Sequence, residues 1–172
     1  MHNITLHPID LIHPNPTDRD ALRNLFNLWH HDLAAMDPSE FPNMSDNGYY
    51  EYTATDVYFE EQCHGKIIAY LIRSNGVLAG FCVISLPPFI VRPDCDWCIQ
   101  EFFITANFRG KGVASEACKT IFKKHPGRCG FDIFRENKGA KVFWSKLINS
   151  VGTDVIVENA DDANDVVYTF TI

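Results

Sequence analysis

Apolar residues recur at helical spacing in three segments of the chain, and this period predicts amphipathic helices. The segments are residues 17–36, 113–124 and 137–148. We expect Thr17 to be the N-cap of the first helix, because its hydroxyl can accept a hydrogen bond from the first turn. The Asp37-Pro38 pair ends that helix, since the residue before a proline disfavours helical geometry.

Shorter runs rich in β-branched and aromatic residues predict seven strands. They cover residues 4–9, 66–73, 77–86, 96–105, 128–134, 154–158 and 166–172. Asn75-Gly76 predicts a hairpin between the second and third strands, and the last two strands close the chain as an antiparallel pair. Between the first helix and the second strand, we expect a polar-aromatic loop over residues 37–56 and a short helix near residues 56–62.

The order of these elements is β-α-(α)-β-β-β-α-β-α-β-β, which predicts an α/β fold. We expect a mixed, mostly antiparallel sheet with helices on both faces. A chain of 172 residues fits a single domain over residues 1–172. No apolar run approaches the roughly 18 residues of a membrane span, and Met1-His2-Asn3-Ile4 lacks the pattern of a secretion signal. We therefore expect a cytoplasmic protein without a membrane partner.

Charge is distributed unevenly along the chain, whose net charge is −7. Residues 105–146 hold ten of the 15 basic residues and only three of the 22 acidic ones. The basic segment suits an anionic cofactor, and the acidic remainder suits a cationic substrate. An acidic chain without interleaved basic and aromatic residues argues against nucleic acid as a partner.

The six cysteines are expected to be free, buried thiols. Cys95 and Cys98 have the C-x-x-C spacing, but a zinc ribbon needs a second such pair and the chain has none. No other group of residues has the spacing and context of a metal site, so we expect no metal.

One segment combines an apolar strand, a basic turn with two glycines, and the start of a helix. It runs from Phe102 to Ala114. Gly110 and Gly112 allow the backbone to approach a pyrophosphate closely, and the helix N-terminus presents N–H groups to it. Arg109 and Lys111 add positive charge. The segment therefore predicts a binding site for a phosphorylated ligand.

The turn matches a family signature. Arg109-Gly110-Lys111-Gly112-Val113-Ala114 resembles the Arg/Gln-x-x-Gly-x-Gly/Ala motif of the GNAT superfamily of N-acetyltransferases. Downstream, Asn137-x-x-Ala140-x-x-Phe143-Trp144-x-Lys146 is similar to a second block of that family. The element order also matches over nearly the whole chain, and Glu101-Phe102-Phe103-Ile104 looks most like its polyamine and small-amine branches.

The resemblance implies acetyl-CoA binding and direct attack of an amine on the thioester, without an acyl-enzyme. The residues that it assigns to the cofactor are Phe102, Phe103, Ile104, Arg109, Gly110, Lys111, Gly112, Val113, Ala114, Asn137, Ala140 and Lys146. The strand residues would pair with the pantetheine arm, the turn would hold the pyrophosphate, and Asn137 would meet the pantetheine or a phosphate.

Two positions depart from the family pattern. Trp144 stands where the family carries a tyrosine proton donor, and an indole N–H can donate a hydrogen bond but is not an acid near neutral pH. Gln100 stands where related polyamine transferases carry a carboxylate, so Glu101 is the candidate base or amine anchor. Adjacent strand residues point to opposite faces, so Gln100 and Glu101 can share the acceptor side only if a bulge intervenes.

The acceptor is the open question at this point. Tyr49 and Tyr50 could line its pocket, because tyrosine rings can hold a cation. The leading hypothesis is acetylation of a small, cationic primary amine. The alternatives are acetylation of a protein N-terminus or lysine, and a catalytically silent acetyl-CoA-binding sensor. The last strand could also pair across a homodimer.

Overall fold

The computed structural model describes residues 2–39, 41, 43–50, 54–90, 92–159 and 165–172. The strands are β1 (Ile4–Pro8), β2 (Ile67–Ser74), β3 (Val77–Ser85), β4 (Trp97–Ile104), β5 (Arg128–Phe134), β6 (Thr153–Asn159) and β7 (Asp165–Thr171). The α-helices are α1 (Pro16–Met36), α2 (Ala54–Val57), α3 (Val113–Lys124) and α4 (Lys138–Val151). Two 3₁₀ turns are η1 (Glu61–Cys63) and η2 (Ala106–Phe108). No helix in the described ranges is long and apolar enough to cross a membrane.

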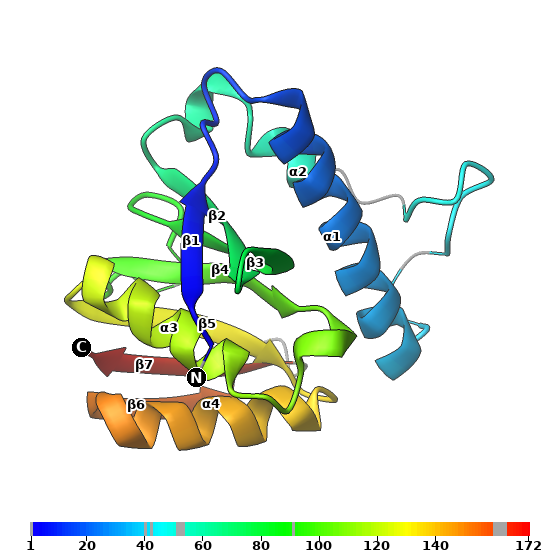
Figure 1. The fold of residues 1–172 in the computed structure, drawn as a ribbon. Helices are drawn as coiled ribbons and strands as arrows, with labels where there is room; N and C mark the ends of the chain where they lie inside the picture. The colour runs from blue at the N-terminus through cyan, green and yellow to red at the C-terminus, as the bar shows by residue number, and fades with distance from the viewer. Residues whose placement is uncertain (1, 40, 42, 51–53, 91, 160–164) are drawn as a thin grey trace.

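The described strands form one sheet in the order β1-β2-β3-β4-β5-β7-β6 (Figure 1). Every neighbouring pair is antiparallel except β4 and β5, which are parallel and joined through α3. The ladder between β4 and β5 contains two residue pairs, Trp97 with Cys129 and Cys98 with Gly130. The sheet therefore opens between these two strands beyond Cys98.

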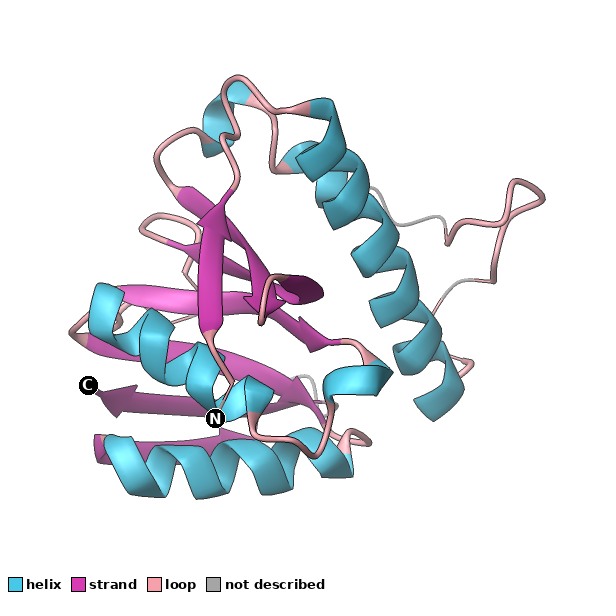
Figure 2. Ribbon diagram, viewed as in Figure 1, coloured by secondary structure: helices cyan, strands magenta, loops and turns pink. Residues whose placement is uncertain are grey.

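Helices cover both faces of the sheet, as the sequence predicts (Figure 2). On one face, α3 and α4 pack on a core that includes Ile72, Phe131 and Phe170. On the other face, α1 and Tyr58 pack on a second core that includes Phe81 and Phe103. The mixed, mostly antiparallel sheet of the predicted α/β fold is thereby confirmed.

Most element bounds agree with the prediction to within a few residues, and those of α3 and β5 agree fully. The predicted N-cap of α1 is wrong. Asn15 caps the helix by accepting the Thr17 N–H at 2.9 Å, because Pro16 fits the first helical position without needing a donor. The short helix expected near residues 56–62 is present in part, since α2 ends at Val57 and residues 61–63 form the separate turn η1.

The thiols behave as the sequence predicts. All six cysteines are free and buried. Cys82, Cys118 and Cys129 lie in the core beneath α3 and α4. Burial raises the pKa of the Cys95 thiol to about 12, which keeps it protonated and unreactive.

Candidate active site

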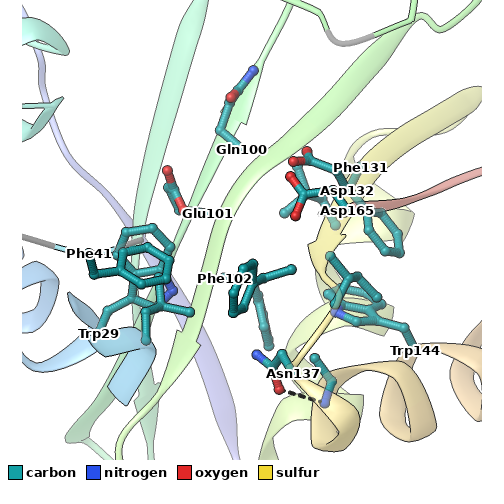
Figure 3. Close-up of a pocket in the computed structure, with 15 residues that line it drawn as sticks. Trp29, Phe41, Gln100, Glu101, Phe102, Phe131, Asp132, Asn137, Trp144 and Asp165 are labelled. Atoms are coloured by element: carbon teal, nitrogen blue, oxygen red, sulfur yellow. Dashed lines mark hydrogen bonds between the residues drawn. The ribbon is translucent and has the colours of Figure 1, made fainter. Parts of the chain in front are cut away.

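A cleft of about 390 Å³ lies where β4 and β5 separate (Figure 3). It reaches both faces of the sheet. On the α4 side its lining residues are Ile99, Phe102, Phe131, Ile133, Asn137, Ala140 and Trp144. On the α1 side they are Trp29, Leu33, Phe41, Gln100, Glu101, Asp132, Phe134 and Asp165. One opening through the sheet thus joins an apolar side to an acidic side.

A β-bulge in β4 puts Gln100 and Glu101 on the same side of the sheet. Glu101 is paired with Val83 and Ile99 with Ile84, so Gln100 is the extra residue between them. Its Nε2 donates to Ser85 Oγ at 2.7 Å and to the Phe89 carbonyl at 2.8 Å. The bulge that the sequence analysis required for Gln100 and Glu101 to point to the same side of the sheet is therefore present.

Glu101 is the central ionisable group of the cleft. Burial raises the pKa of its carboxyl well above the usual range, and the charge of Asp132 raises it further. A hydrogen bond from the Tyr58 side chain opposes this rise. A carboxylate in these surroundings favours an ammonium partner, and a raised pKa makes it a better proton acceptor near neutral pH.

Asp132 and Asp165 add two more carboxylates to the α1 side. Phe131 and Ile133 point into the α4-side core, so Asp132 between them points to the opposite face. Asp165 begins β7 and is the cross-strand partner of Phe134. Figure 3 shows the two aspartates close together, across the cleft from Glu101.

An aromatic pair closes the α1 side. Phe41, from the segment after α1, meets Phe134 of β5 edge to face with ring centroids 5.4 Å apart. Trp29 and Leu33 of α1 continue this apolar rim. The sequence reasoning missed all four of these residues as well as the two aspartates. The alternation along β5 was a readable signal for Asp132, whereas Asp165 depends on the register of the last hairpin.

The α4 side is built around Asn137 and Trp144. Asn137 is the N-cap of α4, and its Oδ1 accepts the Ala140 N–H at 3.0 Å. The Nδ2 of the same side chain is a donor on the lining of the cleft. Trp144 is 5% exposed and packs against Phe131, with ring centroids 4.4 Å apart, and against Phe102.

The glycine turn lies past the end of β4 and opens α3. Gly110 and Gly112 adopt left-handed φ angles of 69° and 82°. A Cβ on either would stand in open space, and no side chain caps α3 at Gly112. The N–H groups of the first turn have no carbonyl partner within the helix. This exposed set of donors fits a pyrophosphate.

Several predicted site residues lie away from the cleft. Tyr50 lines a neighbouring hollow beside α1, which shares Phe41 with the cleft, and its hydroxyl meets His31 Nδ1 at 3.1 Å. Tyr49 is exposed, with its hydroxyl 3.4 Å from Asn24 Oδ1. Lys146 is exposed on α4. The structure brings Glu101, Phe102, Asn137, Ala140 and Trp144 together, but it does not bring these three residues to them.

Arg109 and Lys111 extend away from the turn. Lys111 Nζ donates to the Asn107 carbonyl at 2.8 Å. The Arg109 side chain reaches toward α1 and pairs with Asp32. Both contacts use carbonyl or carboxylate acceptors outside residues 110–114, so neither side chain covers the N–H groups of the turn. No group of three or more metal-ligating side chains is found among the described residues.

The comparisons with known proteins agree with this geometry. A model of the acetyltransferase (GNAT) family matches residues 24–147. A comparison with curated protein sequences gives no match.

Solved structures share the fold across the whole chain. An acetyltransferase from Thermus thermophilus is 15% identical with a TM-score of 0.66, and 100% of each chain is covered. The PaiA N-acetyltransferase from Thermoplasma acidophilum, in complex with coenzyme A, is 15% identical with a TM-score of 0.58 and 99% coverage of each chain. A mutant form of the spermidine/spermine N-acetyltransferase SpeG from Vibrio cholerae is 14% identical with a TM-score of 0.56, covering 99% of this chain and 94% of that one.

At these identities the solved structures establish the fold alone, whereas the family model spans more than half of the sequence and includes the glycine turn and the cleft-lining residues of β4, β5 and α4. The chain therefore belongs to the acetyltransferase (GNAT) family.

Proposed function

We propose that this protein transfers an acetyl group from acetyl-CoA to a primary amine of a small, cationic acceptor. Family membership supports acetyl-CoA-dependent acetyl transfer in general. The observation that carries the acceptor class is the asymmetry of the cleft. Glu101, Asp132 and Asp165 all lie on its α1 side, and its α4 side has no carboxylate among the described residues.

The residues present fit the cofactor. The backbone N–H groups of residues 110–114 would hold the pyrophosphate, and Asn137 Nδ2 would bind an amide of the pantetheine arm. Acetyl-CoA supplies the activated thioester. Phe102, Phe131 and Trp144 form an apolar lining that excludes water from the α4 side.

Glu101 acts on the other reactant. A cationic amine is drawn to the acidic side and places its ammonium against the Glu101 carboxylate. The amine must lose a proton before it can attack, and Glu101 accepts that proton. As the new C–N bond forms, the nitrogen loses its second proton to the leaving thiolate, directly or through solvent, and the C–S bond breaks to release CoA. Glu101 then returns its proton to solvent. The Gln100 side chain donates to Ser85 Oγ and to the Phe89 carbonyl, so it lines the cleft without taking up a proton.

The test begins with calorimetric titration of acetyl-CoA. CoA release is then followed with 1,4-diaminobutane, n-butylamine and a lysine-containing peptide as acceptors. We expect the diamine to have the highest kcat/KM, because its second ammonium can meet Asp132 or Asp165. Faster turnover of the peptide would favour the protein acetyltransferase alternative. Acetyl-CoA binding without turnover of any amine would favour the silent module.

A variant pair tests the acidic side directly. Asp132→Asn should lower kcat/KM for the diamine about fivefold more than for n-butylamine, as a partly solvated charge pair of about 1 kcal/mol would give. Asp46→Asn is the matched control, because Asp46 is exposed and does not line the cleft. An equal loss for both amines would remove Asp132 from acceptor selection.

A further inference from the structure

The Arg109 side chain leaves the signature turn and reaches the helix that lines the acceptor side. Its Nε donates to the Ile104 carbonyl at 2.7 Å, and its guanidinium lies 5.2 Å from the centre of the Phe103 ring. Its Nη2 donates to the carboxylate of Asp32 in α1. The guanidinium therefore holds the end of β4 with two contacts and α1 with a third.

Asp32 sits in the part of α1 that forms the cleft. Trp29 lies one turn before it and Leu33 directly after it, and both line the acceptor side. The other end of α1 is held separately, because Arg19 and Arg23 both pair with Asp56 of α2. Among the described salt bridges, the ion pair of Asp32 is the one that joins the cleft-lining half of α1 to another element.

The backbone of Arg109 leads into the glycine turn that would bind the cofactor. Arg109 is the C-cap of η2, and the chain continues directly into the left-handed glycines of the turn. One residue therefore contributes backbone to the entry of the cofactor turn and a side chain to the acceptor wall. Figure 1 shows η2, which leads into this turn, beside the C-terminal half of α1.

We propose that Arg109 is a positioning residue. Through its ion pair with Asp32 it holds the C-terminal half of α1, which lines the acceptor side of the cleft, in a fixed position relative to the glycine turn of residues 109–114. Its side chain does not bind the pyrophosphate. The effect on the amine rests on the proposed function, whereas the effect on α1 does not. Arg109 belongs to both binding sites, so the coupling between them is reciprocal. Cofactor binding that orders the glycine turn should therefore also order the C-terminal half of α1.

The experiment compares wild type with Asp32→Asn, Asp32→Glu and Asp56→Asn. At saturating acetyl-CoA, Asp32→Asn should raise the KM for 1,4-diaminobutane about fivefold, within the range by which coupling residues act. Its Kd for CoA should stay within about twofold of wild type, since the turn donors are backbone groups. Asp32→Glu should restore the KM. Asp56→Asn, which loosens the other half of α1, should leave both constants unchanged.

A second measurement needs no acceptor. Hydrogen exchange of residues 26–36 is followed with and without CoA, and we expect CoA to slow it in wild type but not in Asp32→Asn. Unchanged slowing in Asp32→Asn would overturn the coupling. A several-fold decrease in the Kd for CoA in Asp32→Asn would also overturn it, because Asp32 would then compete with the pyrophosphate for Arg109.

The two proposals fail in different ways. If CoA slows exchange in α1 but none of the amines is acetylated, the acceptor proposal fails and the coupling stands. If amines are acetylated and exchange in α1 does not respond to CoA, only the coupling fails. If CoA does not bind to the wild-type protein, both are overturned.

Discussion

The α4 side of the cleft is apolar and comes mainly from one short stretch of chain, whereas the α1 side is acidic and comes from five separate segments. Residues 131–144 supply all of the α4 side except Ile99 and Phe102. The α1 side takes residues from α1, the segment after it, β4, β5 and β7. The α4 side is thus built mainly from neighbouring residues in the sequence, whereas the α1 side depends on the topology that brings distant segments together.

The largest expected effect lies in the cofactor turn, outside the acidic side. Gly112→Val forces a β-branched residue to a φ of 82° and places its side chain over the N–H groups of the turn. We expect calorimetric titration to show about a 100-fold loss of affinity for acetyl-CoA, because the free turn can relieve strain of about 1–3 kcal/mol only by leaving the geometry that presents its N–H groups.

The matched control for this variant is Gly48→Val. Gly48 has a φ of 80° and open space around it, but it lies in the segment after α1. It should carry a similar strain and leave the affinity for acetyl-CoA unchanged. If both valine variants lose affinity equally, general destabilisation is the cause and the turn has no special part in binding.

The second effect lies on the acidic side and separates chemistry from cofactor binding. Glu101→Gln should lower kcat/KM for the diamine about 100-fold, the range of general acid–base catalysis, with the Kd for acetyl-CoA unchanged. In wild type, kcat/KM should rise with pH through the raised pKa of Glu101, since only the carboxylate can accept the proton. The variant should lack that rise. An identical pH profile in the two proteins would show that Glu101 is not the base.

The same variant tests the burial of Glu101 by a stability measurement. With a pKa raised in the folded state, the native protein binds more protons than the unfolded chain between the two pKa values. Stability therefore falls as pH rises from the unfolded pKa of about 4.3 toward the folded one. Glu101→Gln should remove this contribution, so its Tm should exceed that of wild type at neutral pH. Glu61→Gln, at an exposed position of η1, is the control.

The same contrast explains how much could be read from the sequence. The bounds of α3 and β5 were predictable because Gly112 and the Pro126-Gly127 pair mark local breaks. The glycine turn and the block that begins at Asn137 were predictable as motifs because each is a continuous stretch of sequence. The prediction assigned the wrong N-cap to the first helix, because both Asn15 and Thr17 have side chains that can cap a helix. Only the structure shows that Pro16 is already helical.

The acidic side was largely beyond prediction, because it depends on register. The bulge at Gln100 exists only relative to β3, so the sequence could give the condition for it but not its presence. Asp165 joins the cleft through its pairing with Phe134, and Phe41 joins it through the path of the segment after α1. Tyr49 and Tyr50 have more suggestive side chains in the same segment, but they pack against α1 and do not line the cleft.

The smallest expected effect on kcat concerns Trp144, which stands where the family pattern has a tyrosine. It tests whether the α4 side of the cleft takes part in the chemistry. Trp144 is buried between Phe131, Phe102 and Phe143, so its ring acts as packing. Trp144→Phe should lower the free energy of unfolding by about 1 kcal/mol through the lost volume and leave kcat within about threefold, since a neutral hydrogen bond contributes about 0.5–1.5 kcal/mol. Chemical denaturation and steady-state kinetics measure the two quantities. A kcat reduced tenfold or more, with acetyl-CoA affinity intact, would mean that the indole N–H supports the leaving thiolate. The division into a binding side and a reacting side would then no longer hold.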